Sequence, residues 1–308
     1  MRHRPASRQF AGLGLAMALL LAACGKTAQP PSAQVAPTNG PEGEALLLAI
    51  HPYDTPSRIL ARFQPLCDYL GAEIGRPVRP YIAHSYDDQI RRITGGQVDL
   101  AYLGPAPYLS ASGRIRDDPA WGGLELLAAE TLHGVAGYHS VILVRAQSPI
   151  QTLSDLRGGS FAFADHHSYG GHFIPRTQLW EAGLTLADLR DYTYLGRHER
   201  VALAVAHGDF DAGGLREDVA RLYLGRGLRI IASSPLLPPH VIVARSGLDP
   251  TLAAAVRKAL IDPGPAMAPA LAALGEGVGF ATMEAGAFEP ARRMVKALEG
   301  ALPVQETP

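Results

Sequence analysis

Short apolar runs and segments with helical spacing alternate along the chain from residue 46 onward. The run LLLAI at 46–50 is continuously apolar, which is typical of a strand buried on both faces of a parallel sheet. Strand, helix, strand, helix, strand is the order of an open α/β sheet with right-handed crossovers. The elements expected in this first part are strands at 46–50, 78–83, 98–104, 124–130 and 139–146, and helices at 57–75 and 85–97.

The same alternation starts again at residue 160 and ends in a return segment after residue 238. It predicts two α/β lobes joined by two extended hinge strands: lobe 1 from 44–137 and 241–308, and lobe 2 from 138–240. A ligand is expected in the cleft between them, because α/β proteins bind ligands at strand ends and domain interfaces. The elements expected here are strands at 160–164, 192–196, 209–215, 228–234 and 240–246, and helices at 173–183, 198–208, 217–227, 249–262 and 289–300.

The first 43 residues have a different composition. Three arginines precede the apolar run FAGLGLAMALLLAA, which reads as a bacterial export signal. The following LAAC at 21–24 resembles the lipobox of bacterial lipoproteins, so 1–24 is predicted to be a signal peptide and Cys24 the lipidated residue; an ordinary signal peptide or an uncleaved anchor is the alternative. The Pro-rich segment 25–43 predicts a flexible linker, which would hold an exported domain at a membrane surface.

Composition narrows the classes of partner. The chain has 308 residues and a formal net charge of −1, which gives no reason to expect nucleic acid as a partner. Its two cysteines, Cys24 and Cys67, exclude a disulfide framework. Cys67 lies in a helical pattern and is expected to be a small buried hydrophobe.

One polar stretch, FADHHSYGGHF at 163–173, raises the question of metal binding or catalysis. The histidines open to metal binding are His166, His167, His172, His198 and His240. Adjacent histidine side chains in extended backbone point apart, so no metal site is predicted here. No Gly-x-Ser-x-Gly elbow, GxxxxGK[ST] loop or HExxH motif is present, and no enzyme activity or cofactor is expected.

Five segments in order carry a family resemblance: HPYDTPSRI, VDLAYLGPAPYL, TLSDLRGGSFAFAD, VALAVAHGDFDAGGL and SSPLLPPHVIVARSGLDPTL. Together they resemble the phosphate/phosphite/phosphonate-binding (PhnD-type) family of periplasmic solute-binding proteins, over about 44–295. The resemblance implies the type II periplasmic binding fold and a cleft that closes over a small oxyanion. It also implies delivery of that oxyanion to an ABC transporter permease.

The resemblance also implies a set of site residues. In the family, backbone N–H groups and hydroxyls at the helix start after the FAFAD strand hold the oxyanion, and a helix start favours negative charge. Aromatic hydroxyls of the first lobe and side chains near the hinge complete the site, although which of Arg216, Glu217 and Asp218 points inward stays open. The residues carried over are Tyr53, Tyr102, His167, Ser168, Tyr169, Gly170, His198, Arg216 and His240.

Departures from the family pattern concern the ligand. Tyr169 and Gly170 replace small hydroxyl residues, Arg197 replaces a serine, and His240 replaces an aspartate. A histidine at 240 disfavours a ligand amine, since it repels a cation when charged. If charged His198 or His240 holds the anion, affinity falls as pH rises past about 6.5.

The sequence therefore predicts a monomeric, lipid-anchored periplasmic protein that captures a small oxyanion for an ABC transporter. Two alternatives stay open: a ligand sensor that signals to a membrane kinase, and a histidine-mediated metal-binding protein.

Overall fold

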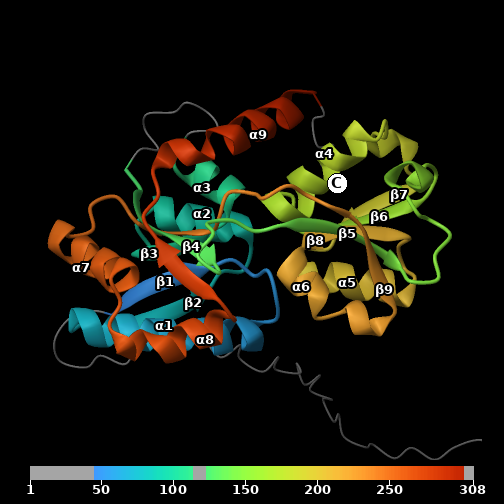
Figure 1. Ribbon diagram of the computed structural model, residues 1–308. Coiled ribbons are helices and arrows are strands. Elements are labelled where there is room, and N and C mark those ends of the chain that lie inside the picture. The colour runs from blue at the N-terminus through green and yellow to red at the C-terminus, as the bar shows by residue number, and fades with distance from the viewer. Residues whose placement is uncertain (1–44, 114–122, 302–308) are drawn as a thin grey trace, which may run out of the picture. The chain divides into compact units, whose positions relative to one another are not determined.

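The computed structural model describes residues 45–113 and 123–301, and the predicted signal peptide and linker lie outside these ranges. Figure 1 shows two β-sheets, each covered by helices on both faces. The predicted α/β architecture of two lobes is confirmed, because the strands divide between these sheets in the expected order.

Within the described ranges the first sheet contains six strands in the order β11-β4-β10-β3-β1-β2. Strand β1 pairs in parallel with β2 and β3, and β10 pairs antiparallel with β3 and β4. The strands are β1 (Leu46–Ile50), β2 (Val78–Ile82), β3 (Leu100–Leu103), β4 (Glu125–Leu132), β10 (Val241–Ala244) and β11 (Val278–Ala281). The helices of this lobe are α1 (Pro56–Ile74), α2 (Tyr86–Thr94), α3 (Pro105–Ala111), α7 (Pro250–Ile261), α8 (Ala268–Leu274) and α9 (Glu289–Ala301).

The second sheet, counted over the same described residues, contains five strands in the order β7-β6-β8-β5-β9. Strand β6 pairs in parallel with β7 and β8, whereas β5 pairs antiparallel with β8 and β9. The strands are β5 (Ser140–Arg145), β6 (Ser160–Phe163), β7 (Asp191–Tyr194), β8 (Ala212–Arg216) and β9 (Leu228–Ser233). The helical segments include a π-helical turn (Tyr169–Phe173), α4 (Ile174–Glu181), α5 (His198–His207) and α6 (Glu217–Arg221).

Helix α1 shows how the sequence pattern becomes structure. Pro56 lies in its first turn, where the missing N–H is not needed, and Gly75 ends the helix at φ 66°. Full burial of each large apolar side chain contributes about 1.5–3 kcal/mol. The buried residues recur on one face and are Ile59, Phe63, Leu66, Cys67, Tyr69 and Leu70.

Two chain segments connect the lobes, one between β4 and β5 and the other between β9 and β10. They meet at an antiparallel bridge: the Leu237 N–H donates to the Tyr138 carbonyl at 2.8 Å, and the Tyr138 N–H donates back at 3.2 Å. Gly137 has φ 155°, and a Cβ there would lie 2.6 Å from the Leu237 carbonyl oxygen. The glycine therefore allows the two connections to lie together, which places Tyr138 between the lobes.

Among the α-helices and β-strands of the described residues, α3, α8 and β11 were not expected from the sequence. Helices α3 and α8 are seven residues each, and β11 has four. In the part of the chain that the structure describes, none of the helices has the length and apolar character needed to cross a bilayer.

Candidate functional site

Polar and aromatic side chains gather where the strands of the first sheet end. His51 and Tyr53 follow β1, Tyr86 begins the helix after β2, and Tyr102 lies near the end of β3. All four are at most 2 % exposed. Because β1, β2 and β3 are parallel, their carboxyl ends share one edge, which is where ligands bind in open α/β sheets.

Two of these rings, His51 and Tyr102, form a stack with His240 from the second connection. The planes of His51 and Tyr102 are 1° apart, and His240 stacks on Tyr102 with ring centroids 5.0 Å apart. The Tyr102 hydroxyl donates to a Glu130 carboxylate oxygen at 2.6 Å. The stack therefore holds His240 and Tyr102 in fixed orientations between the lobes.

Arg216, at the end of β8, brings a positive charge to this stack. Its Nε and Nη2 each donate to an Asp218 carboxylate oxygen at 2.9 Å, and its Nη1 lies 3.0 Å from His240 Nε2. The guanidinium carbon lies 5.2 Å and 5.5 Å from the ring centroids of Tyr53 and Tyr138, within the range of cation–π attraction. Arg216 is 4 % exposed, so the structure holds a buried cation where the two lobes meet.

Ser168 and His198 form a second group of donors beside Arg216. The Ser168 hydroxyl caps the π-helical turn by accepting the Gly171 N–H at 3.0 Å, and it lies 3.3 Å from His198 Nε2. His198 Nδ1 accepts the Arg216 backbone N–H at 3.1 Å. Neutral His198 therefore carries its proton on Nε2 and donates to the Ser168 oxygen, which leaves the hydroxyl proton of Ser168 to be donated elsewhere.

Contacts between the lobes hold these groups together. The His198 N–H donates to the Tyr53 carbonyl at 3.1 Å. Burial raises the pKa of Tyr86 well above its usual value, against the effect of a hydrogen bond with Ser168. We call the residues that meet here the inter-lobe cluster: His51, Tyr53, Tyr86, Tyr102, Glu130, Tyr138, Ser168, His198, Arg216, Asp218 and His240.

The histidines of the inter-lobe cluster are neutral. Burial, with the charge of Arg216 as the next cause, lowers the pKa of His51 and of His198 to about 3 and the pKa of His240 well below its usual value. Burial disfavours the Arg216 charge as well, but Asp218 outweighs it and raises the pKa of the guanidinium. Arg216 is therefore the cation of the inter-lobe cluster near neutral pH, and the pKa shifts give no support to the hypothesis that His198 or His240 is charged there.

Some predicted site residues lie apart from the inter-lobe cluster. The Tyr169 hydroxyl donates to the Met294 sulfur of α9 at 3.5 Å. His167 pairs with Asp87 of α2 at 2.7 Å. Gly170 contacts the cluster through its backbone alone: a Cβ there would lie 2.9 Å from Tyr138 Cε2, so a glycine is needed for the tyrosine to approach.

The structure also resolves which residues after β8 point inward. Arg216 and Asp218 join the inter-lobe cluster, whereas Glu217 pairs with Arg221 on α6. Sequence reasoning missed several members, although His51 directly follows a predicted strand and Tyr86 lies at the start of a predicted helix, so position alone could have identified them. The members missed are His51, Tyr86, Glu130 and Tyr138.

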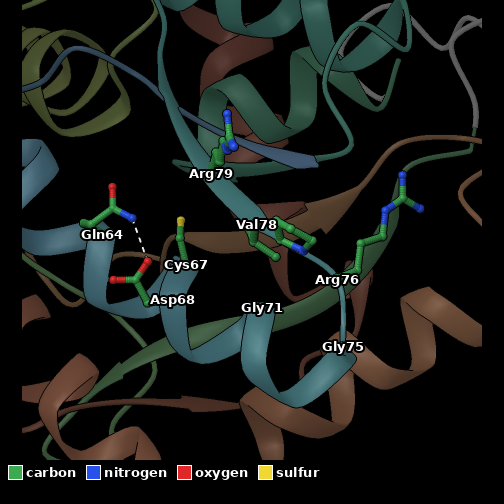
Figure 2. Close-up of a pocket in the computed structure, with 9 residues that line it drawn as sticks. Gln64, Cys67, Asp68, Gly71, Gly75, Arg76, Val78 and Arg79 are labelled. Carbon is green, nitrogen blue, oxygen red and sulfur yellow. Dashed lines mark hydrogen bonds between the residues drawn. The ribbon is translucent and has the colours of Figure 1, made fainter. Parts of the chain in front are cut away.

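A separate pocket of about 460 Å³ lies along α1 and the start of β2, at the opposite edge of the first sheet (Figure 2). Its thiol, Cys67, is fully buried, and burial raises the thiol pKa far above its usual value, so the thiol is unreactive. The Gln64 amide donates to the Asp68 carboxylate at 2.8 Å within the pocket wall. The pocket shares no residue with the inter-lobe cluster.

Two α/β lobes with these strand orders define the type II fold of periplasmic binding proteins. The model of one family, the periplasmic phosphonate substrate-binding proteins of ABC transporters, matches residues 48–287. The chain belongs to this family, which confirms the predicted resemblance and an extracytoplasmic class of protein.

Individual relatives agree with this assignment. The phosphate-import protein PhnD of Mycolicibacterium smegmatis is 28% identical over 262 residues, which cover 80% of this chain and 78% of that protein. The phosphonates-binding periplasmic protein of Escherichia coli is 26% identical, with 71% of this chain and 67% of that protein covered. The fold matches PhnD1 of Prochlorococcus marinus in complex with methylphosphonate, with a TM-score of 0.73 and 17% identity, over 83% of this chain and 98% of that one.

Proposed function

We propose that this protein captures a small phosphorus oxyanion between its lobes and delivers it to an ABC transporter. The observation that carries the proposal is the buried Arg216, whose backbone N–H is linked through His198 to the hydroxyl donor Ser168, in a chain of the phosphonate-binding family. In this proposal the protein binds and releases its ligand without chemical change. A lipid on Cys24, the linker 25–43 and a monomeric state are parts of the same proposal.

The donors suit an oxyanion because they come from both lobes. Arg216 and Ser168 belong to the second lobe, and the tyrosine hydroxyls of Tyr53 and Tyr86 belong to the first. Burial raises the pKa of Tyr53 to about 12, so its hydroxyl keeps its proton and can donate. An anion that accepts from both lobes stabilises the arrangement in which they are together.

The buried charge of Arg216 favours a ligand without an amine. Of the two carboxylates in the inter-lobe cluster, Asp218 pairs with Arg216 and Glu130 accepts the Tyr102 hydroxyl. A ligand ammonium group would be repelled by Arg216 and would have to share Glu130 with Tyr102, which is unfavourable in a buried site. Simple oxyanions such as phosphate, phosphite and methylphosphonate carry no ammonium group and therefore suit the inter-lobe cluster better than aminoalkylphosphonates.

A ligand panel tests the proposal. At about a hundred times its dissociation constant a ligand should stabilise the protein by roughly 2.7 kcal/mol. We expect such stabilisation from at least one of phosphate, phosphite and methylphosphonate, and affinity at least tenfold weaker for 2-aminoethylphosphonate than for methylphosphonate. Thermal unfolding and calorimetric titration measure both. A panel in which no phosphorus oxyanion stabilises the protein would refute the function, and preferred binding of the amine would refute the charge argument.

Ser168→Ala is expected to weaken the binding of the best ligand by about 10- to 100-fold, because a hydrogen bond to a charged group contributes about 1.5–3 kcal/mol. The variant also loses a helix cap, at a cost of about 1 kcal/mol in folding stability. Asp249→Ala is the matched control, since Asp249 caps α7 by accepting the Leu252 N–H at 2.9 Å and lies outside the inter-lobe cluster. Calorimetric titration of both variants separates the two effects; unchanged affinity in Ser168→Ala would remove the hydroxyl from the site.

A further inference from the structure

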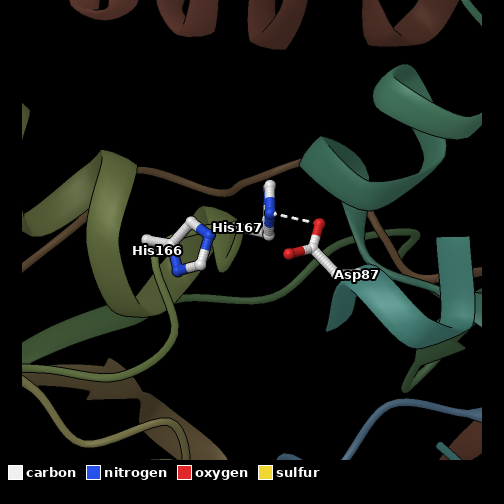
Figure 3. Close-up of side chains that lie close together, drawn as sticks. All are labelled: Asp87, His166 and His167. Atoms are coloured by element: carbon white, nitrogen blue, oxygen red, sulfur yellow. Dashed lines mark ion pairs between the residues drawn. The ribbon is translucent and has the colours of Figure 1, made fainter. Parts of the chain in front are cut away.

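A second group of side chains lies outside the inter-lobe cluster and joins the two lobes (Figure 3). Asp87 comes from the first turn of α2, and His166 and His167 come from the loop after β6. Each offers one ligand atom, and these atoms lie within 4.8 Å of one another. His167 Nε2 is 2.7 Å from Asp87 Oδ1.

The two adjacent histidines do not point apart, contrary to the sequence-based expectation. Their ring centroids are 4.1 Å apart and their planes are tilted by 45°. The cause is a tight turn after β6, in which Asp165 accepts the His167 N–H on its side chain at 2.8 Å and the Ser168 N–H on its carbonyl at 2.8 Å. Because the backbone turns here, the side-chain alternation of extended backbone does not apply.

The chemistry of this group suits a divalent transition metal ion. Two imidazoles and a carboxylate are common zinc ligands, at about 2.0–2.2 Å from the ion, with water completing the tetrahedron. Tetrahedral ligand atoms at that distance are roughly 3.3 Å apart, so small rotations from the present spacing suffice. The side chains of Asp87, His166 and His167 are 47%, 49% and 29% exposed, which leaves room for an ion and its water.

A carboxylate behind the histidines adds support for this geometry. Asp165 Oδ1 lies 3.8 Å from His166 Nδ1. Metal-bound histidines usually donate the N–H of their other ring nitrogen to such a carboxylate. A small rotation of either side chain would bring Asp165 within hydrogen-bond distance of His166.

We propose that Asp87, His166 and His167 bind a divalent transition metal ion of the zinc type, which fastens the two lobes together. The complete set of ligands exists only when the lobes are in contact, because Asp87 belongs to the first lobe and the histidines to the second. Ion and oxyanion then favour the same arrangement, so each should tighten the binding of the other by the same factor. This coupling rests on the proposed oxyanion function, whereas metal binding itself does not.

Zinc titration of the full chain without a histidine tag tests the site directly. We expect one high-affinity Zn²⁺ per chain by calorimetry, and Co²⁺ to give the visible absorption of a tetrahedral site. Asp87→Asn and His167→Asn should each weaken zinc binding at least tenfold. His207→Asn is the control, because His207 is an exposed histidine at the end of α5 outside the group. Zinc binding that is unchanged in both Asp87→Asn and His167→Asn would overturn the site.

Two further measurements test whether zinc holds the lobes together. Zinc should tighten methylphosphonate binding at least fivefold in the wild type and not in Asp87→Asn. Zinc alone should lower the radius of gyration in small-angle scattering, again not in Asp87→Asn. If phosphate, phosphite and methylphosphonate all fail to bind with or without zinc, the oxyanion function fails and scattering alone decides the metal link. If zinc binds but neither quantity changes, the ion does not fasten the lobes.

Discussion

Arg216→Gln is expected to weaken oxyanion binding at least a hundredfold. Arg216 is the buried cation of the inter-lobe cluster, with its guanidinium fixed by Asp218 and His240 and held between two tyrosine rings. Charge-assisted hydrogen bonds contribute about 1.5–3 kcal/mol each, so the loss of two costs at least two orders of magnitude in affinity. Calorimetric titration with methylphosphonate and phosphate measures the change.

The variant should still fold, which keeps the result interpretable. Removing one partner of a fully buried ion pair is strongly destabilising, but the Asp218 side chain is 43% exposed and can be hydrated when Arg216 is replaced. Arg216→Lys keeps the charge but lacks the planar guanidinium with its several N–H donors. Its oxyanion affinity should lie between those of the wild type and Arg216→Gln. Arg190→Gln is the control, because Arg190 is 66% exposed and pairs with Asp211 in the same lobe. Arg216→Gln affinity within threefold of the wild type, in a variant with normal unfolding, would remove Arg216 from the site.

The fold was predictable because residues that are buried in a strand or a helix recur in the sequence with the period of that element. The apolar run of β1 and the helical spacing of α1 each specify one element, and their alternation specifies the topology. Elements without such a hydrophobic pattern were missed. Strand β11 has four residues including a glycine, and α8 is rich in alanine and begins near a proline. Their structure depends on packing against α1 and β4, which no local pattern contains.

The inter-lobe cluster was predictable where position in an element alone decides membership. Tyr102 and His198 lie at element ends that face the other lobe, so their places in the cluster follow from the topology. The charge of a histidine does not follow from its position, because burial and the nearness of Arg216 set the pKa of His198. Tyr138 was missed for a similar reason: its place depends on the bridge to Leu237, which pairs distant segments. The turn at Asp165 likewise brings two histidines together where an extended chain would separate them.

The free energy of unfolding is expected to fall steeply as pH drops from 6.5 to 4.5. Burial lowers the pKa of His51, His172 and His198 to about 3 in the folded protein, whereas an unfolded histidine has a pKa near 6.5. Between these values the unfolded chain binds protons that the folded chain does not, so acid favours unfolding. The three groups together give an upper limit of about 4 kcal/mol per pH unit. Burial raises the pKa of Asp165, which acts in the opposite direction where this carboxyl group titrates.

Urea unfolding at pH 7.5, 6.5, 5.5 and 4.5 measures this slope. His198→Asn should reduce the slope by about one proton, or about 1.4 kcal/mol per pH unit, because the asparagine does not titrate while its oxygen can still accept the Arg216 N–H. His207→Asn, at an exposed histidine, should leave the slope as in the wild type. Stability that stays level from pH 6.5 to 5.0 would show that these histidines are not neutral and buried. In that case protonated His198 and His240 return as candidates for holding the anion, and affinity that falls as pH rises past about 6.5 would then be expected.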